Sequence, residues 1–360
     1  MKKRPPIFLL PAICMLLFLV PFYASAQVAK DTLLASQYFK KADSLFIELK
    51  FESSIEFFNK ALPIYKKEKV WEKVVNCYNR LSKTLRYDSK YEESKESATT
   101  ALEICKQYLK KNHRQEANAY DNIGHYYQKT ASDFKTASEY FNKAFEIRKK
   151  IFPENHEDIA ISYDKLGLLF LRKGMMTKAL ENYNKCLNIR KKIFDKKHIA
   201  IANSYERLAT VFRFQGKYEK AMSYYQKELE IRIQKYGEKH ISIANPCWSL
   251  ATMYMHMAEY EKAEIQLKKA LEIRTNSNAG RSTNLAYLYN TLGTLYKNKG
   301  EYDLSIYYYK KSLALIIELF GEENPNTIGF YYGLGFLYQL MGFDDKALHY
   351  MRKALKITLA

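Results

Sequence analysis

The sequence predicts an all-α solenoid of about eight helix–turn–helix repeats. The stretch 156–197 reappears at 198–239 with matching apolar positions, which gives an internal period of 42 residues. Repeats of this length are typical of stacked helical units. Within a repeat, apolar residues recur at i, i+3, i+4 and i+7 from Tyr205 to Phe212, which places them on one face of a helix. Gly216 follows in the predicted turn, where glycine allows the chain to leave the helix.

Small residues recur in register and define the two helices of each repeat. Because small side chains let two helix backbones approach closely, these sites indicate where the paired helices touch. The first-helix sites are Ala42, Ser82, Gly124, Gly167, Ala209, Ala251, Gly293 and Gly335. The second-helix sites are Ser54, Ala61, Ser94, Ala101, Ala137, Ala144, Ala179, Cys186, Ala221, Ala263, Ala270, Ser305, Ser312, Ala347 and Ala354. Glu228 breaks the pattern at one second-helix site.

At these residues the chain resembles the tetratricopeptide repeat (TPR) family. Its 42-residue form, with HEDIA, HIAIA, HISIA and ENPNTI between repeats, is similar to the arrays of kinesin light chains and of bacterial exported and signalling proteins. The resemblance implies a right-handed superhelical solenoid over residues 27–360, in which the first helices line a concave groove. The expected repeats are roughly 35–70, 75–110, 115–152, 156–197, 198–239, 240–281, 282–323 and 324–360.

The first 26 residues read as a secretory signal peptide. Basic residues 2–4 precede the apolar run Ile7–Val20, and Ala24–Ala26 offers a small-residue cleavage site. The alternative is an uncleaved membrane anchor, but prolines interrupt the run, which is shorter than the roughly 20 apolar residues that a spanning helix needs. We therefore expect export to the periplasm or the extracellular space, with no stable membrane span after cleavage.

The chain is strongly basic. Its formal charge is +19, and removal of Lys2, Lys3 and Arg4 with the signal peptide would leave +16 (19 − 3). Basic clusters end equivalent helices at 148–150 and 190–192, and Arg232, Lys235 and Arg274 continue the series more thinly. Cations are favoured at helix C-termini by the helix dipole. The alternative is a positive ridge that attracts nucleic acid or another polyanion.

Four cysteines follow the predicted signal peptide, namely Cys77, Cys105, Cys186 and Cys247. Each falls inside a predicted helix. Two disulfides are conceivable in an oxidising compartment, but buried thiols are the favoured interpretation because free cysteine is among the most buried residue types.

Three histidines, His156, His198 and His240, recur at the repeat interval. Neighbouring helix axes lie about 8–10 Å apart, whereas zinc ligands lie about 2 Å from the metal. We therefore expect each histidine to start the next helix from the inter-repeat turn. No metal site, cofactor or catalytic constellation can be assembled from the sequence, so we do not expect an enzyme.

The remaining polar stripe of each first helix is the candidate binding site, because it would line the concave groove in a TPR array. Amides can pair with a peptide backbone, Arg and Lys with acidic groups, and Trp and Tyr offer flat anchors. The candidates for binding a protein or peptide segment are Asn203, Glu206, Arg213, Asn245, Trp248, His256, Tyr287, Asn290 and Lys297. The same register in earlier repeats gives Asn118, Asp121, His125, Gln128, Ile161, Asp164, Leu168, Leu171 and Arg172.

The last predicted helix, from about Asp345 to Ile357, has no polar capping helix after it. Two expectations follow. Either this end associates with another copy of the chain end to end, or the array is the recognition half of a longer effector of the CHAT-protease or sensor-kinase type.

Overall fold

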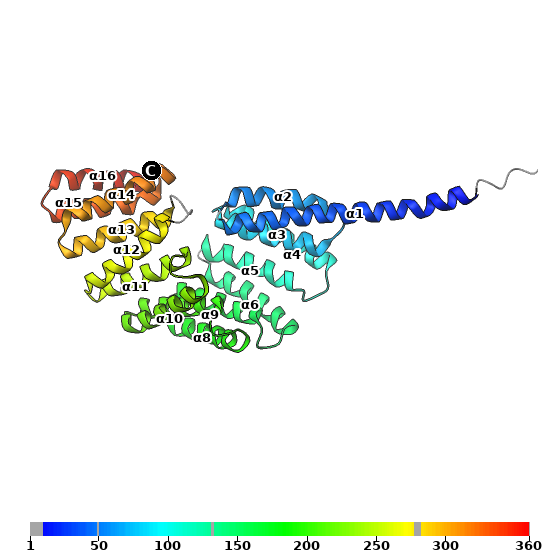
Figure 1. Ribbon diagram of the computed structural model, residues 1–360, viewed down its shortest axis with the longest axis horizontal. Helices are drawn as coiled ribbons and strands as arrows, with labels where there is room; N and C mark the ends of the chain where they lie inside the picture. The colour runs from blue at the N-terminus through cyan, green and yellow to red at the C-terminus, as the bar shows by residue number, and fades with distance from the viewer. Residues whose placement is uncertain (1–9, 49, 131–132, 277–281, 360) are drawn as a thin grey trace, which may run out of the picture. The chain divides into compact units, whose positions relative to one another are not determined.

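The computed structural model describes residues 10–48, 50–130, 133–276 and 282–359, with side chains from Ala29 onward. Over these residues the chain forms sixteen α-helices, two short 3₁₀-helices and no strand (Figure 1). The all-α repeat prediction is confirmed. Contacts divide the chain into two compact units, a first unit that ends at Met175 and a second unit that begins at Met176. Each unit is described by itself.

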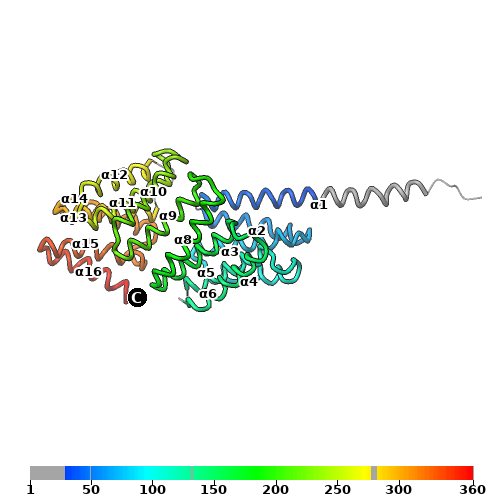
Figure 2. The backbone as a smooth tube through the Cα atoms, turned by 90° about the horizontal axis from the view of Figure 1, so that it is seen from below, coloured from blue at the N-terminus to red at the C-terminus, as the bar shows by residue number. Residues whose placement is uncertain are grey.

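The first unit is a row of helix hairpins. Helices α1 and α2, α3 and α4, and α5 and α6 pair with one another, and each hairpin packs against the next (Figure 2). Helix α7 packs on α6. Its helices are α1 (Leu10–Ile47), α2 (Phe51–Lys67), α3 (Trp71–Tyr87), α4 (Tyr91–Tyr108), α5 (Arg114–Lys129), α6 (Phe134–Ile151) and α7 (Glu157–Arg172).

The second unit repeats this arrangement. Helix α8 packs on α9, and the hairpins α9–α10, α11–α12, α13–α14 and α15–α16 follow in order (Figure 1). Its helices are α8 (Met176–Ile193), α9 (Ile199–Phe214), α10 (Tyr218–Tyr236), α11 (Ala244–His256), α12 (Tyr260–Asn276), α13 (Thr283–Lys299), α14 (Tyr302–Phe320), α15 (Ile328–Leu340) and α16 (Asp344–Leu359). The 3₁₀-helices η1 (Ile241–Ile243) and η2 (Pro325–Thr327) precede α11 and α15.

The predicted signal peptide lies partly outside the described residues. Residues 1–9 are not described, and residues 10–26 are described only as backbone at the start of α1, so its cleavage stays a prediction. None of the described helices is long and apolar enough to cross a membrane.

The small-residue sites are all buried, as the register predicts. Where serine replaces alanine, its hydroxyl donates across the hairpin. Ser54 Oγ donates to the Ala42 carbonyl at 2.8 Å, and Ser305 Oγ donates to the Gly293 carbonyl at 2.7 Å. Serine therefore fits because its polar atom finds a backbone acceptor on the partner helix.

Turns and caps also follow the repeat. Gly216 has φ +70°, the left-handed conformation expected of the glycine between two paired helices. The Nδ1 atoms of His156, His198 and His240 accept from the backbone N–H groups two residues later at 3.1, 3.3 and 3.2 Å. Each ring also stacks on an aromatic ring four residues earlier, with centroids 4.0, 3.8 and 4.6 Å apart. The prediction that these histidines start the next helix is confirmed.

All four cysteines are buried, as predicted. Burial raises the pKa of the Cys105 thiol to about 12 and that of Cys247 to about 11. Both thiols are therefore protonated near neutral pH, and a protonated thiol is a poor nucleophile.

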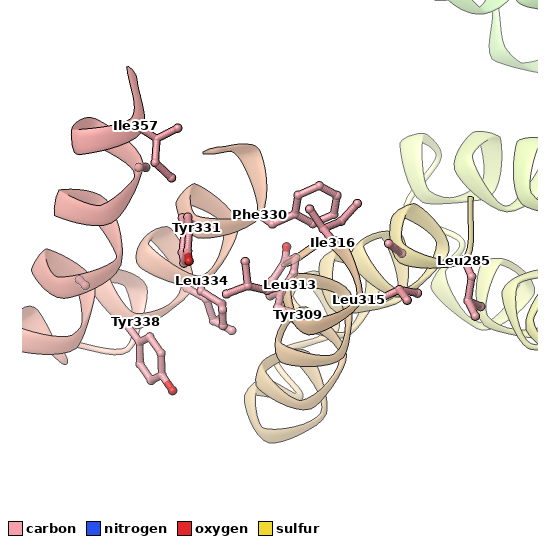
Figure 3. Close-up of a cluster of buried hydrophobic side chains, with 14 residues drawn as sticks. Leu285, Tyr309, Leu313, Leu315, Ile316, Phe330, Tyr331, Leu334, Tyr338 and Ile357 are labelled. Atoms are coloured by element: carbon pink, nitrogen blue, oxygen red, sulfur yellow. The ribbon is translucent and has the colours of Figure 1, made fainter. Parts of the chain in front are cut away.

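A large hydrophobic cluster holds the last hairpins of the second unit together. Leu313 and Ile316 of α14 face Phe330 and Leu334 of α15, and Ile357 of α16 closes the cluster (Figure 3). Helix α16 also has an exposed apolar side, with Leu348, Leu355 and Leu359 between 46% and 78% exposed. End-to-end association through this region stays a prediction.

The close approach at Gly293 makes a testable prediction. A Cβ added there would lie 2.7 Å from Cδ1 of Tyr309, whose ring is buried and whose hydroxyl lies 2.9 Å from Thr294 Oγ1. Gly293→Val is expected to lower the free energy of unfolding by at least about 1–3 kcal/mol, because the ring has to move. Urea unfolding measures this change.

Gly333→Ala is the matched control. Its added Cβ would meet the same Tyr309 ring at 3.4 Å, an ordinary contact, so the gain in helix propensity should stabilise the chain by up to about 1 kcal/mol. Equal changes in the free energy of unfolding for the two substitutions would show that α13 and α14 do not touch at Gly293.

Candidate binding groove

A groove runs across the first helices of three consecutive repeats in the second unit. It encloses a cavity of about 600 Å³ between α9, α11 and α13, with Tyr225 reaching in from α10. This volume is typical of ligand sites. The lining residues are Glu206, Thr210, Arg213, Tyr225, Trp248, Ser249, Thr252, Met255, His256, Thr291, Thr294 and Asn298.

The structure brings four of the nine predicted residues together at this cavity, namely Glu206, Arg213, Trp248 and His256. The other five do not line it. Asn203, Asn245 and Tyr287 are exposed near the start of their first helices. Asn290 and Lys297 are half-buried on α13, and Lys297 Nζ lies 5.0 Å from the centroid of the Phe336 ring.

Trp248 forms part of the groove wall. Its ring is half-buried, and its Nε1–H donates to Thr291 Oγ1 of the next repeat at 3.0 Å. Pro246 lies in the first turn of α11, where its missing N–H leaves no helical bond unmade. The helix therefore starts close to the tryptophan, and the ring is held by its bond to the next repeat and by packing against the neighbouring hydrophobic cluster.

Threonine hydroxyls make up much of the groove surface. Thr210, Thr252 and Thr294 each donate to the carbonyl oxygen four residues earlier, at 2.9, 3.0 and 3.1 Å. Because the hydroxyl proton is used in this way, the oxygen faces a ligand mainly as an acceptor. Tyr225 and Thr291 were not among the expected groove residues; Tyr225 lies on a second helix, and its hydroxyl is 3.4 Å from Thr210 Oγ1.

Charges of both signs border the groove. Glu206 contributes a carboxylate, and the Arg213 guanidinium lies over the Phe214 ring at 4.4 Å from its centroid. The His256 ring stacks on Tyr218 with centroids 4.6 Å apart. An arginine held over an aromatic ring is placed to pair with a carboxylate of a ligand.

The asparagines at the start of two first helices are tied to arginines at the end of second helices. Arg232 Nη2 donates to Asn203 Oδ1 at 2.9 Å, and Arg274 Nη2 donates to Asn245 Oδ1 at 2.5 Å. Their amide oxygens are therefore used within the protein.

Three arginines of the alternative positive ridge are buried. Arg148, Arg190 and Arg274 are 2%, 7% and 6% exposed, so they do not form a surface ridge. Arg148 donates to Ser162 Oγ at 3.0 Å, and Arg190 donates to Ser204 Oγ at 2.9 Å. The arginine side chain is long enough to reach from the last turn of one repeat to the next repeat, whereas the lysines beside it stay exposed.

Comparison with known proteins supports the repeat assignment. The family model described as "Tetratricopeptide repeat" matches residues 74–150, 158–234, 242–315 and 284–360, which is more than half of the chain. Among curated proteins, no sequence matches this chain.

Several solved structures share the fold at low sequence identity. The apo quorum sensor NprR from B. thuringiensis is 15% identical, with a TM-score of 0.67 over 93% of this chain and 92% of its own. Apo RapI is 16% identical, with a TM-score of 0.58 over 90% and 97%. BtubC (BKLC) from P. vanneervenii is 22% identical, with a TM-score of 0.56 over 64% and 92%. With its repeat register, buried small-residue sites and family match, this chain belongs to the tetratricopeptide repeat family.

Proposed function

We propose that the groove of the second unit binds an extended polypeptide segment and that the protein is a noncovalent interaction scaffold. The observation that carries this proposal is the position of Trp248, an aromatic wall in a cavity of about 600 Å³ that is otherwise lined mostly by hydrogen-bonding groups. Aromatic side chains in partly desolvated pockets supply much of the energy of protein recognition.

The polar groups of the groove suit a peptide backbone. Threonine oxygens such as those of Thr210 and Thr252 accept hydrogen bonds, so backbone N–H groups can face them. Arg213 fits an acidic side chain, and Glu206 a basic one. The expected partner is therefore an extended segment that places an apolar or aromatic side chain against Trp248 and an acidic side chain near Arg213.

The test uses the two tryptophans of the chain. Trp71 lies in the first unit and stacks on Tyr108, with ring centroids 3.9 Å apart. In a Trp71→Phe background, Trp248 alone reports on the groove. Peptides selected from a random display library on the immobilised protein are expected to change the Trp248 emission on binding.

Trp248→Ala is expected to weaken binding of the selected peptides by at least about tenfold, since anchor residues of this type contribute about 2 kcal/mol or more. Trp71→Phe is the control and should leave the affinity as it is. Unchanged affinity of Trp248→Ala, measured by calorimetry, would refute the groove assignment.

Salt dependence separates this proposal from the polyanion alternative. Binding of a peptide through mixed polar and aromatic contacts should weaken little between 50 and 200 mM salt, whereas polyanion binding falls steeply with salt concentration. A steep loss of affinity, shared by Trp248→Ala and the parent chain, would favour the polyanion alternative.

We also propose that the protein is exported. The support is the order of charge, apolar run and small residues within the first 26 positions. Intact-mass measurement of the protein from its own cell should show a chain that begins at Gln27. Recovery of the uncleaved chain from the cytoplasm would contradict the proposal.

A further inference from the structure

A second cavity lies in the first unit, away from the groove proposed above to bind a polypeptide. It has a volume of about 350 Å³ and lies among α3, α5 and α7, with Tyr91 at the start of α4. Its lining residues are Arg86, Tyr87, Ser89, Tyr91, His125, Gln128, Lys129, Leu168 and Arg172.

The lining carries three cations, Arg86, Lys129 and Arg172, and no aspartate or glutamate. Further cations lie nearby. Burial, followed by the charges of Arg80, Arg86 and Lys165, lowers the pKa of Lys83 to about 8. The lining itself therefore carries three positive charges and no negative one.

Two carboxylates close in sequence to lining residues pair with cations of their own. Asp121 binds Arg148 at 2.5 Å and also pairs with Lys165, so two cations share one carboxylate. Asp88, just after α3, pairs with Lys90 at 2.8 Å. Asp121 is thus bound to two cations. Asp88 has one ion-pair partner, and its buried Oδ2 makes no hydrogen bond among the described residues.

Two buried hydrogen-bond donors of the lining lack an acceptor among the described residues. They are Nε of Arg86 and Nε2 of Gln128, and the Gln128 side chain belongs to a residue that is only 4% exposed. A buried donor without an acceptor is costly. An anion in the cavity would supply both the missing negative charge and the missing acceptor atoms.

His125 contributes an uncharged polar side chain to the lining of this cavity. Burial first, and then the charges of Arg86, Lys165 and Arg172, lower its pKa well below the usual range. The ring is therefore uncharged near neutral pH, and it is already hydrogen-bonded to the Gln128 side chain, so that at most its other ring nitrogen can face a ligand.

We propose that this cavity binds a phosphate-type dianion. Three lining cations with no lining carboxylate match a dianion better than a monoanion, and arginine binds phosphate oxygens in a bidentate manner. The dianion could be free inorganic phosphate or the phosphoryl group of a phosphorylated side chain; the chemistry at the cavity is the same.

The first experiment titrates the full chain with inorganic phosphate by calorimetry at constant ionic strength, with acetate as the monoanion comparison. Phosphate is expected to bind saturably at one site, and acetate at least about tenfold more weakly.

Arg86→Gln and Arg172→Gln are each expected to weaken phosphate binding by about 10- to 100-fold, as loss of a hydrogen bond to a charged group implies. Arg172 is exposed, so its variant should fold as the parent does.

Arg80→Gln is the matched control. It removes the same charge from the same helix, but Arg80 pairs with Asp43 at 2.5 Å and does not line the cavity. Its phosphate affinity should stay within about twofold of the parent. An absence of saturable binding, equal losses in Arg80→Gln and Arg86→Gln, or equal affinity for acetate would each overturn the proposal.

A second arm distinguishes the two sources of the dianion. End-blocked phosphoserine and end-blocked serine are titrated, and inorganic phosphate is used as a competitor. If phosphoserine competes with phosphate and binds more tightly than phosphate does, the natural ligand is a phosphorylated segment. If inorganic phosphate binds more tightly, the natural ligand is the free ion. Trp248→Ala should not alter either affinity, so this result is separable from the test of the peptide groove.

Discussion

Replacing Asp121 by alanine is expected to lower the free energy of unfolding of the first unit by about 3–5 kcal/mol. The Asp121 side chain is 3% exposed and pairs with Arg148, whose side chain is 2% exposed, and with Lys165. Burial alone would raise the pKa of Asp121, but the charges of Lys165 and Arg148 and their hydrogen bonds lower it below its usual value. The variant would leave two cations in the interior without a counter-charge.

Urea unfolding followed by circular dichroism measures this loss. Glu139→Ala, an exposed acidic residue on α6 of the same repeat, is the control and should change stability by less than about 0.5 kcal/mol. Adding Lys165→Met to Asp121→Ala should recover part of the loss, because one of the two uncompensated charges is removed. A double variant no more stable than Asp121→Ala would show that the loss does not come from buried charge.

Glu228→Gln is expected to stabilise the second unit above neutral pH by up to about 3 kcal/mol. Glu228 occupies a small-residue site, is 2% exposed and accepts from Arg232 Nε at 2.7 Å. Burial raises its pKa to about 7 despite the attraction of Arg232; the charge of Glu206 raises it further, and that of Arg207 lowers it. Glutamine keeps a similar shape and can still accept from Arg232.

The sign of the pH effect follows from the raised pKa. Between pH about 4.5, the usual value of the carboxyl, and pH about 7, the folded chain binds more protons at this site than the unfolded chain. The stability of the parent therefore falls as the pH rises through this range and is constant above it. The difference between Glu228→Gln and the parent should be small at pH 4.5 and largest at pH 8.

Glu230→Gln is the matched control, since it lies two residues later on the exposed side of α10. Its free energy of unfolding should equal that of the parent both at pH 4.5 and at pH 8. A Glu228→Gln variant that is less stable than the parent at pH 8 would contradict the interpretation that desolvation of the carboxylate outweighs its ion pair.

The fold could be predicted because its main determinants are local and repeated. Small residues such as Ala209 and Gly293 must be small for the hairpin to close, and histidines such as His156 must accept from the next helix. Both requirements leave only a few residue types at each register position, and Glu228 is the exception at the small-residue sites. Trp248 was predicted to face the groove for the same reason, since the register places it there.

The contacts between repeats could not be read in this way. Arg148 was expected at the surface but reaches two neighbouring helices, because the direction of a long side chain depends on acceptors that lie far away in sequence.

The basic cavity was predicted in part. His125, Gln128, Leu168 and Arg172 belong to the stripe given for the earlier repeats, whereas Arg86 and the excess of positive charge were not predicted. The same stripe can be placed on α3 from its small-residue site Ser82. It starts six positions before Ser82 and follows the i, i+3, i+7, i+10 pattern, so its last two members are Lys83 and Arg86. The register therefore contained the signal for these two cations.

The arginine pairs at Asn203 and Asn245 restrict what a partner can offer there. Since each Oδ1 is held by a guanidinium, the amide cannot flip without breaking that bond, and only its NH₂ group remains for a ligand. A ligand that reaches either position therefore has to offer a hydrogen-bond acceptor there, such as a carbonyl or carboxylate oxygen, because a donor would find no free amide oxygen.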